Sequence, residues 1–171
     1  MVFISSTGIL AGTANSIVIT GLGSGTYASH RLIVHNLTLD TANRSIVFQA
    51  SVDSGANYGS LWTHTRLLTG TTSVISTGTV GGSVPLGEGS TSGGTTGLSG
   101  TIDIIYGTAT NNRTHAIFAL SWYNYNPTYY VMRASGFYDS NSDINAVKFL
   151  QTNGEAANFI GTVRLYGISK T

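Results

Sequence analysis

The chain has 171 residues, of which 9% are charged, and its formal net charge at pH 7 is +1. A chain of this length can fold as one domain with its own core, and its eight scattered basic residues are too few to hold a nucleic-acid backbone. The absence of cysteine excludes disulfides, thiolate metal sites and a cysteine nucleophile. The chain shows neither the basic and apolar segments of a signal peptide nor the run of about 20 apolar residues that spans a membrane. We therefore expect one domain over residues 1–171, with neither nucleic acid nor membrane as a partner.

Residue composition favours strands and turns over helices. The chain contains 22 glycines and many Ser and Thr residues, while 41% of its residues are hydrophobic. Helices favour Ala, Leu, Glu and Lys, and a disordered chain carries more charge and fewer hydrophobic residues than this one. An all-β fold is the expectation.

Segments that alternate apolar and polar residues recur from one end of the chain to the other. In chain order they are Ser16–Thr20, Arg31–Leu37, 46–52, Leu61–Leu68, Ile102–Tyr106, His115–Tyr123, Tyr129–Ala134, Ala146–Leu150 and Thr162–Ile168. The clearest is 46–52, in which one face carries Ile46, Phe48, Ala50 and Val52 and the other carries Ser45, Gln49 and Ser51. Short strands at intervals of about ten residues, separated by Gly, Asn, Asp and Ser, predict an antiparallel sandwich or barrel.

Three further segments connect or adjoin these strands. Asp53–Asn57 has the composition of a hairpin turn. Gly78–Gly100 is rich in glycine, and we interpret it as a long surface loop, with room for a short strand, inside one domain rather than as a linker between two. Ser142–Phe149 fits either a helix or a loop followed by a strand.

Catalytic and metal-binding motifs are missing from the sequence. The histidines lie at positions 30, 35, 64 and 115, and no two of them have the spacing of metal ligands. Neither a Gly-x-Ser-x-Gly nucleophile elbow nor a phosphate-binding loop occurs. Asp139–Asp143 resembles the start of a calcium loop, but Ile144 stands where that loop requires glycine, so an Asx-rich turn is the better interpretation. We predict that the protein is not an enzyme and uses no cofactor or metal ion.

A cluster of aromatic residues surrounds a predicted hairpin tip. Its members are Trp122, Tyr123, Tyr125, Tyr129 and Tyr130, with asparagines between them. Rings that stack on sugars and amides that bond to hydroxyls would form a glycan-binding patch. The same residues fit a subunit interface, where Tyr and Trp are enriched, or an ordinary division between core and surface. The sequence leaves these three interpretations open.

Five segments of the chain carry a resemblance to a known family. In chain order they read FISSTGILAGTANSIVITGL, YASHRLIVHNL, IVFQASVDSGANY, GLSGTIDIIY and NAVKFLQTNGEAANFIGTVRLYGI. Their order is similar to that of small virion structural proteins of tailed bacteriophages. Residues 58–96 match poorly, and Asp53-Ser54-Gly55 stands where such proteins usually have Asp-Gly-Gly. The resemblance implies a jelly-roll-like antiparallel β-sandwich on the virion surface.

The family includes head-decoration (cement) proteins and parts of tail fibres. We expect a capsid decoration protein, because the sequence contains no coiled-coil or β-helix shaft of the kind that attaches a tail fibre. Its partners would be further copies of itself, as a homotrimer, and the major capsid protein or other virion proteins. The alternative is a tail-fibre or receptor-binding domain that recognises host surface glycans through residues 122–130.

Overall fold

The computed structural model describes residues 1–6, 10–23, 25–40, 45–59, 62–69, 74–80, 82–86, 97–107, 113–123, 128–138, 142–151 and 158–170, with 10–14, 62–64, 66 and 74–80 described by their backbone alone. In this part of the chain the regular elements are all β-strands, and every pairing between them is antiparallel. No helix among these residues has the length and apolarity to cross a membrane.

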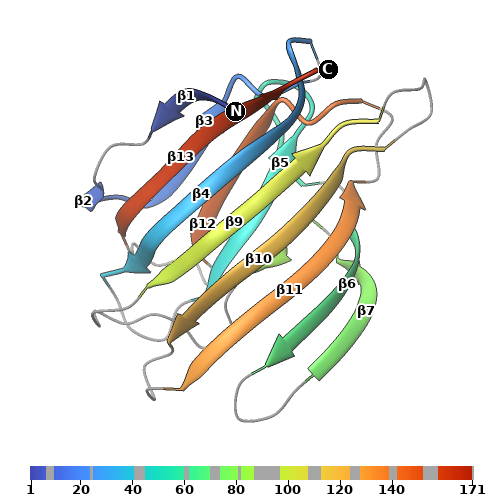
Figure 1. The fold of residues 1–171 in the computed structure, drawn as a ribbon. Coiled ribbons are helices and arrows are strands. Elements are labelled where there is room, and N and C mark those ends of the chain that lie inside the picture. Colours follow the sequence, from blue (N-terminus) through green and yellow to red (C-terminus); the bar gives the residue numbers. More distant parts are fainter. Residues whose placement is uncertain are drawn as a thin grey trace.

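The strands form two sheets (Figure 1). The larger has the order β1-β13-β4-β9-β10-β11-β6-β7, with β2 also paired to β13. Its strands are β1 (Val2–Ser6), β2 (Leu10–Ala14), β4 (Tyr27–Leu39), β6 (Trp62–Thr69), β7 (Val74–Val80), β9 (Leu98–Ile105), β10 (His115–Tyr123), β11 (Tyr129–Tyr138) and β13 (Phe159–Ser169). The smaller has the order β3-β12-β5-β8, with β3 (Ser16–Thr20), β5 (Ile46–Ser51), β8 (Val84–Pro85) and β12 (Ala146–Gln151). The chain crosses repeatedly from one sheet to the other.

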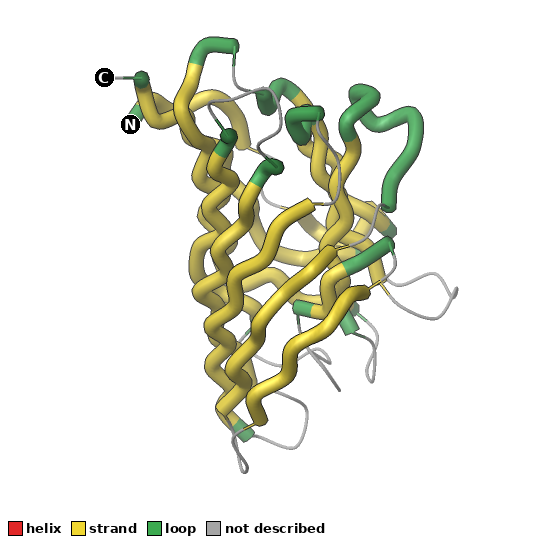
Figure 2. The backbone as a smooth tube through the Cα atoms, turned by 90° about the vertical axis from the view of Figure 1, so that its right-hand side faces the viewer, coloured by secondary structure: helices red, strands yellow, loops and turns green. Residues whose placement is uncertain are grey.

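The two sheets pack face to face and enclose the core, as the side view in Figure 2 shows. In one row across the large sheet, Leu165, Leu32, Ile102, Phe118 and Ala134 are neighbours in register, and all five are buried. Because side chains alternate in direction along a strand, the rows on either side of this one face outward. The predicted fold class, an all-β antiparallel sandwich, is confirmed.

Phe48 links the two sheets across the core. Its ring meets Phe118 of the large sheet and Phe149 of the small sheet edge to face, with centroid distances of 5.6 and 5.5 Å. Ile46, Phe48 and Ala50 are buried and Val52 is partly buried against the core, which agrees with the predicted inward face. The predicted outward position of Ser51 is wrong: Ser51 is fully buried, because its hydroxyl bonds to Asp53 and to the Gly55 N–H in the turn that follows.

The last strand is an interior strand next to one edge of the large sheet. β13 pairs with β4 along one edge and with β1 and β2 along the other. The alternation along Thr162–Ile168 predicts that Val163 and Leu165 point into the core, and both are buried. Arg164 is exposed, and Thr162 and Tyr166 are half-buried on the outer side.

The nine predicted strands are present, and Ser16–Thr20 and His115–Tyr123 coincide with β3 and β10. Residues 142–149 form a loop followed by β12, which was one of their two predicted alternatives. The sequence analysis did not predict β1, β2 and β7. All three lie at edges of the large sheet. An edge strand can pair without burying a full face, so the apolar alternation that reveals a strand is weak there; in β1 every residue is at least partly exposed.

The turn at Asp53–Asn57 is confirmed, but its interpretation as a hairpin is wrong. It connects β5 of the small sheet to β6 of the large sheet. The hydroxyl of Ser51 and the backbone and side-chain amides of Asn57 donate to the Asp53 carboxylate, and these bonds lower the pKa of Asp53 to about 2. A carboxylate that accepts several hydrogen bonds fixes a tight turn, and this turn redirects the chain from one layer to the other.

The glycine-rich stretch Gly78–Gly100 contributes to both sheets. Residues 78–80 end β7, Val84–Pro85 form β8, and β9 begins at Leu98. Residue 81 and residues 87–96 lie outside the described residues. The short strand that the sequence analysis admitted in this segment is therefore β8. A surface loop remains a prediction for residue 81 and residues 87–96.

Candidate functional site

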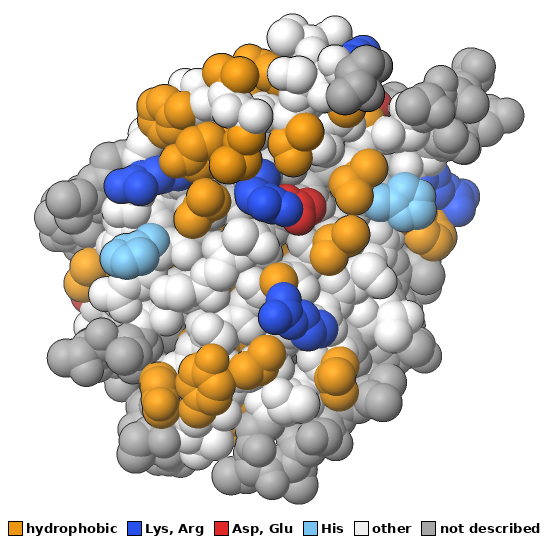
Figure 3. All heavy atoms as spheres, viewed as in Figure 1, with side chains coloured by type: hydrophobic (Ala, Val, Ile, Leu, Met, Phe, Trp, Pro, Cys, Tyr) orange, Lys and Arg blue, Asp and Glu red, His pale blue; other side chains and the backbone are white. Residues whose placement is uncertain are grey.

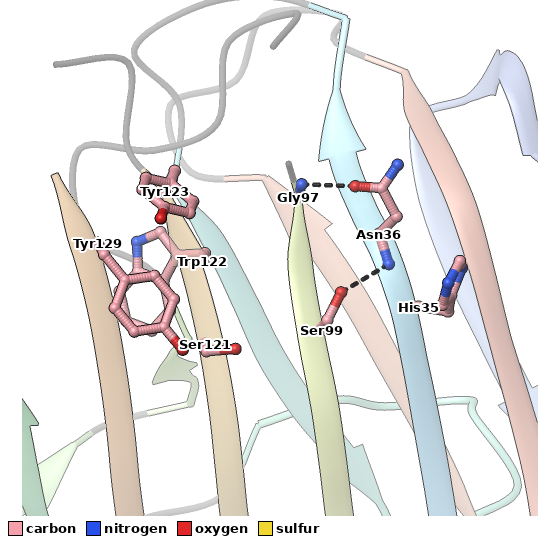
Figure 4. Close-up of a pocket in the computed structure, with 8 residues that line it drawn as sticks. All are labelled: His35, Asn36, Gly97, Ser99, Ser121, Trp122, Tyr123 and Tyr129. Carbon is pink, nitrogen blue, oxygen red and sulfur yellow. Dashed lines mark hydrogen bonds between the residues drawn. The ribbon is translucent and has the colours of Figure 1, made fainter. Parts of the chain in front are cut away.

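A groove with a volume of about 340 Å³ opens on the outer side of the large sheet, near one end of β4, β9, β10 and β11. We call it the aromatic groove; it is lined by His35, Asn36, Gly97, Ser99, Ser121, Trp122, Tyr123 and Tyr129. In Figure 4 the three aromatic residues lie on one side, Asn36 and His35 on the other, and the two serines between them.

The polar side of the groove is built on a bulge in β4. The strand register shifts between Val34 and Leu37, and Asn36 adopts a left-handed conformation with φ of 48°. The Asn36 backbone N–H donates to Ser99 Oγ over 2.9 Å, and the Gly97 N–H donates to Asn36 Oδ1 over 2.6 Å (Figure 4). These two bonds hold Asn36 in a conformation that non-glycine residues rarely adopt.

Two glycines make this bulge possible. A Cβ atom on Gly97 would lie 2.7 Å from the Leu37 carbonyl oxygen, and one on Gly161 would lie 2.4 Å from the Asn36 carbonyl oxygen. Both distances are shorter than van der Waals contact, and Gly161 also has φ of +125°. The strands on both sides of Asn36 therefore require glycine where they approach it.

The aromatic residues at this end of β10 and β11 form two ring pairs with different exposure. Trp122 is 2% exposed, and its indole stacks on Tyr130 with a centroid distance of 5.5 Å and an interplanar angle of 12°. Tyr123 and Tyr129 face each other across β10 and β11 with a centroid distance of 5.1 Å, and they are 41% and 49% exposed. The predicted aromatic residues thus divide between the core and an accessible surface. Tyr125 lies outside the described residues.

Among the described residues, the groove is lined by hydrogen-bonding groups and by no carboxylate, lysine or arginine. Asn36 uses Oδ1 for Gly97, which leaves its Nδ2 donors available, and Ser99 accepts from Asn36 and can still donate its own hydroxyl proton. Ser121 and the exposed His35 line the same space. An uncharged ligand with an apolar side and several hydroxyl or amide groups matches this lining.

A second surface occupies the middle of the same sheet. We define the outer-sheet face by Leu67, Ile105, Ile117 and Arg133, which are all exposed. A hollow of about 400 Å³ runs between β6, β10 and β11 beside Leu67, Ile117 and Arg133. Figure 3 shows hydrophobic side chains spread across this side of the molecule between uncharged ones, with few charged groups.

The charges on this side of the large sheet are mostly positive. Arg31 forms a bidentate ion pair with Asp103 over 2.6 and 2.9 Å, and this pair raises the pKa of Arg31. Arg133 and Arg164 are exposed and have no ion-pair partner among the described residues. The outer-sheet face therefore presents apolar side chains beside an unneutralised cation.

One buried polar pair lies between the two sheets near the opposite end of β4. His30 Nδ1 and the Tyr106 hydroxyl are 2.8 Å apart, and the Gly23 N–H donates to the same hydroxyl over 2.9 Å. His30 Nε2 is buried without a hydrogen-bond partner. Burial lowers the pKa of His30 and raises that of Tyr106. Because both residues are buried, this pair has a structural role.

The sequence analysis found the aromatic residues of the groove but not its polar ones. The position of His35 inside a strand predicts a structural histidine, whereas the structure places it on the exposed rim of the groove. Asn36, Ser99 and Ser121 carried no recognisable motif. Within the described ranges, no three His, Asp or Glu side chains gather as metal ligands.

A comparison with known proteins found no matching family model, no matching curated protein and no matching solved structure.

Proposed function

We propose that this protein is a non-enzymatic structural protein of a tailed-phage virion, and specifically a capsid decoration protein that docks on the particle surface. The sequence motifs that resemble small virion proteins support the virion role. The outer-sheet face is the observation that carries the docking role.

The outer-sheet face has the properties of a protein-docking surface. Ile105, Ile117 and Leu67 are each between 37% and 44% exposed on a broad sheet. Covering such side chains contributes about 25 cal/mol for each Å² of apolar surface removed from water. A cluster of exposed apolar side chains on one face is typical of a surface that another protein covers.

The charges define the chemistry of the partner. Because Arg133 has no ion-pair partner among the described residues and Asp103 is already paired with Arg31, an approaching surface needs a carboxylate opposite Arg133. A second copy placed with the same face inward would add arginines rather than acids. The proposed partner is therefore a different virion protein, such as the major capsid protein, with an acidic residue in an apolar surface.

The test uses particles that lack this protein and purified protein added back to them. Wild-type protein should bind in many copies per particle, as peptide quantification by mass spectrometry against the major capsid protein would show. Arg133→Glu should reduce binding by at least about ten-fold, because the attraction between Arg133 and a carboxylate of the partner becomes a repulsion between two carboxylates. Lys148→Glu is the matched control, because it makes the same change of charge on the small sheet and should bind as wild type.

Three results would contradict this proposal. The protein would be absent from purified particles, or Arg133→Glu would bind as well as Lys148→Glu. Alternatively, Arg133→Glu would change the oligomeric state of the free protein, which would make the outer-sheet face a contact between copies.

A further inference from the structure

The aromatic groove is separate from the surface proposed for docking. Tyr123 and Ile117 both lie on β10, and six residues of strand separate them, which corresponds to about 20 Å. A ligand in the groove would therefore contact one end of the sheet, and a protein on the outer-sheet face would contact its middle. Ligand binding in the groove does not depend on the virion role.

We infer that the aromatic groove binds a neutral saccharide. The exposed rings of Tyr123 and Tyr129 are tilted by 52° to each other, so each supplies its own apolar ring face, and the C–H face of a pyranose ring is complementary to one such face. Across the groove, the Asn36 Nδ2, the Ser99 hydroxyl and the Ser121 hydroxyl are the described groups that can bond to hydroxyls at the edge of the sugar.

Hydrogen bonds and close strand contacts fix the shape of the groove on its polar side. Asn36 is strained, with φ of 48°, and it is held there by Ser99 and Gly97. Glycines at 97 and 161 allow the neighbouring strands to approach it. Strained residues held by their surroundings cluster at ligand-binding sites, because there the conformation positions a side chain. In this conformation Asn36 Oδ1 accepts a hydrogen bond from the Gly97 N–H, while Asn36 Nδ2 has no hydrogen bond among the described residues.

Trp122 supports the groove from the core side. Its indole belongs to the hydrophobic core and stacks on Tyr130, on the opposite face of β10 from Ser121 and Tyr123. The core therefore fixes the part of the strand that carries the groove residues.

The lining also selects the class of sugar. No arginine or lysine is among the described residues that line the groove, so a carboxylated, sulfated or phosphorylated sugar finds no charged partner in that lining. The volume of about 340 Å³ lies at the lower end of the range of about 300–1,000 Å³ for small-molecule sites, which favours one or two sugar rings over a long buried chain.

The test is a titration of the isotope-labelled full chain, followed by amide chemical shifts. The neutral probes are the methyl glycosides of mannose, galactose, glucose and N-acetylglucosamine, and the charged probes are N-acetylneuraminic acid and galacturonic acid. At least one neutral glycoside should shift the amides of Ser99, Ser121 and Tyr129. The charged sugars should bind more weakly.

Two variants probe the two sides of the groove. Tyr129→Ala should weaken binding about ten-fold, which corresponds to about 1.4 kcal/mol. Asn36→Asp keeps an oxygen for the Gly97 N–H and replaces the free Nδ2 donor, so it should weaken binding without disturbing the bulge. Tyr166→Ala is the matched control, because it removes another tyrosine from the same side of the large sheet and should bind as wild type.

The inference is overturned if none of the neutral glycosides shifts the groove amides at millimolar concentration. It is also overturned if Tyr129→Ala and Tyr166→Ala bind equally well, because the shifts would then report contact elsewhere. The particle-binding experiment with Arg133→Glu and Lys148→Glu is a separate test, so a failure to bind saccharides does not contradict the proposed docking role.

Discussion

Replacing Phe48 by alanine should remove the contact that joins the two sheets. Phe48 has no exposed surface, and its ring makes edge-to-face contacts with Phe118 and Phe149, one in each sheet. Truncating a buried phenylalanine costs about 3–5 kcal/mol through lost burial and the cavity that remains. We expect the upper part of this range, because each lost aromatic pair contributes about 0.5–1.5 kcal/mol beyond its area. A domain is stable by only about 5–15 kcal/mol, so this loss is a large fraction of the total.

Urea denaturation followed by tryptophan fluorescence measures the effect. With a slope of about 2 kcal/mol per M, a loss of about 4 kcal/mol lowers the midpoint by about 2 M. Gln49→Ala is the control, because Gln49 is the next residue, is half-buried on the other face of β5 and pairs with Lys148. It should change stability by about 0.5 kcal/mol or less. Equal losses for Phe48→Ala and Gln49→Ala would refute the assigned facing of β5.

Four further predictions follow from the fold. Truncation after Asn158 removes β13, which joins β1 and β2 to β4, so no cooperative thermal transition should remain; a soluble product that still melts cooperatively would show that β13 is peripheral. Gly161→Ala should destabilise by at least about 1–3 kcal/mol, because its Cβ meets the Asn36 carbonyl oxygen at a positive φ; an unchanged urea midpoint would contradict this. Burial lowers the pKa of His30 from its ordinary value of 6.5, so the unfolded chain takes up the proton first and the stability of the fold should fall as the pH drops below 6.5. The His30→Phe protein should lack this loss; if the difference in urea midpoint between wild type and His30→Phe is the same at pH 8 and pH 5, the prediction is wrong. Light scattering should show a homotrimer, and Phe3→Lys should weaken it, because β1 is an uncharged edge strand with Phe3 exposed; a wild-type monomer at micromolar concentration would rule it out.

The local pattern of side chains was sufficient to identify most strands. The period of two in Ser16–Thr20 and His115–Tyr123 reflects one buried and one outward face, and this pattern can be read without knowledge of the partner strand. The same reasoning placed Val163 and Leu165 in the core. It also located the aromatic residues on two consecutive antiparallel strands, where Tyr123 now faces Tyr129.

What the pattern did not contain is which strands become neighbours. The turn at Asp53–Asn57 resembles a hairpin because its residues suit a reversal, but only the packing of the core sends β6 to the other sheet. The aromatic groove depends on the same kind of decision. Asn36 lies 63 residues from Ser99, and their hydrogen bond exists because β4 pairs with β9 on one side of a bulge. Alternation along a strand is set by neighbours in sequence, whereas pairing between strands depends on burial summed over the whole core. The sequence by itself therefore indicated the aromatic rings of the groove, and only the tertiary structure brought the polar residues opposite them.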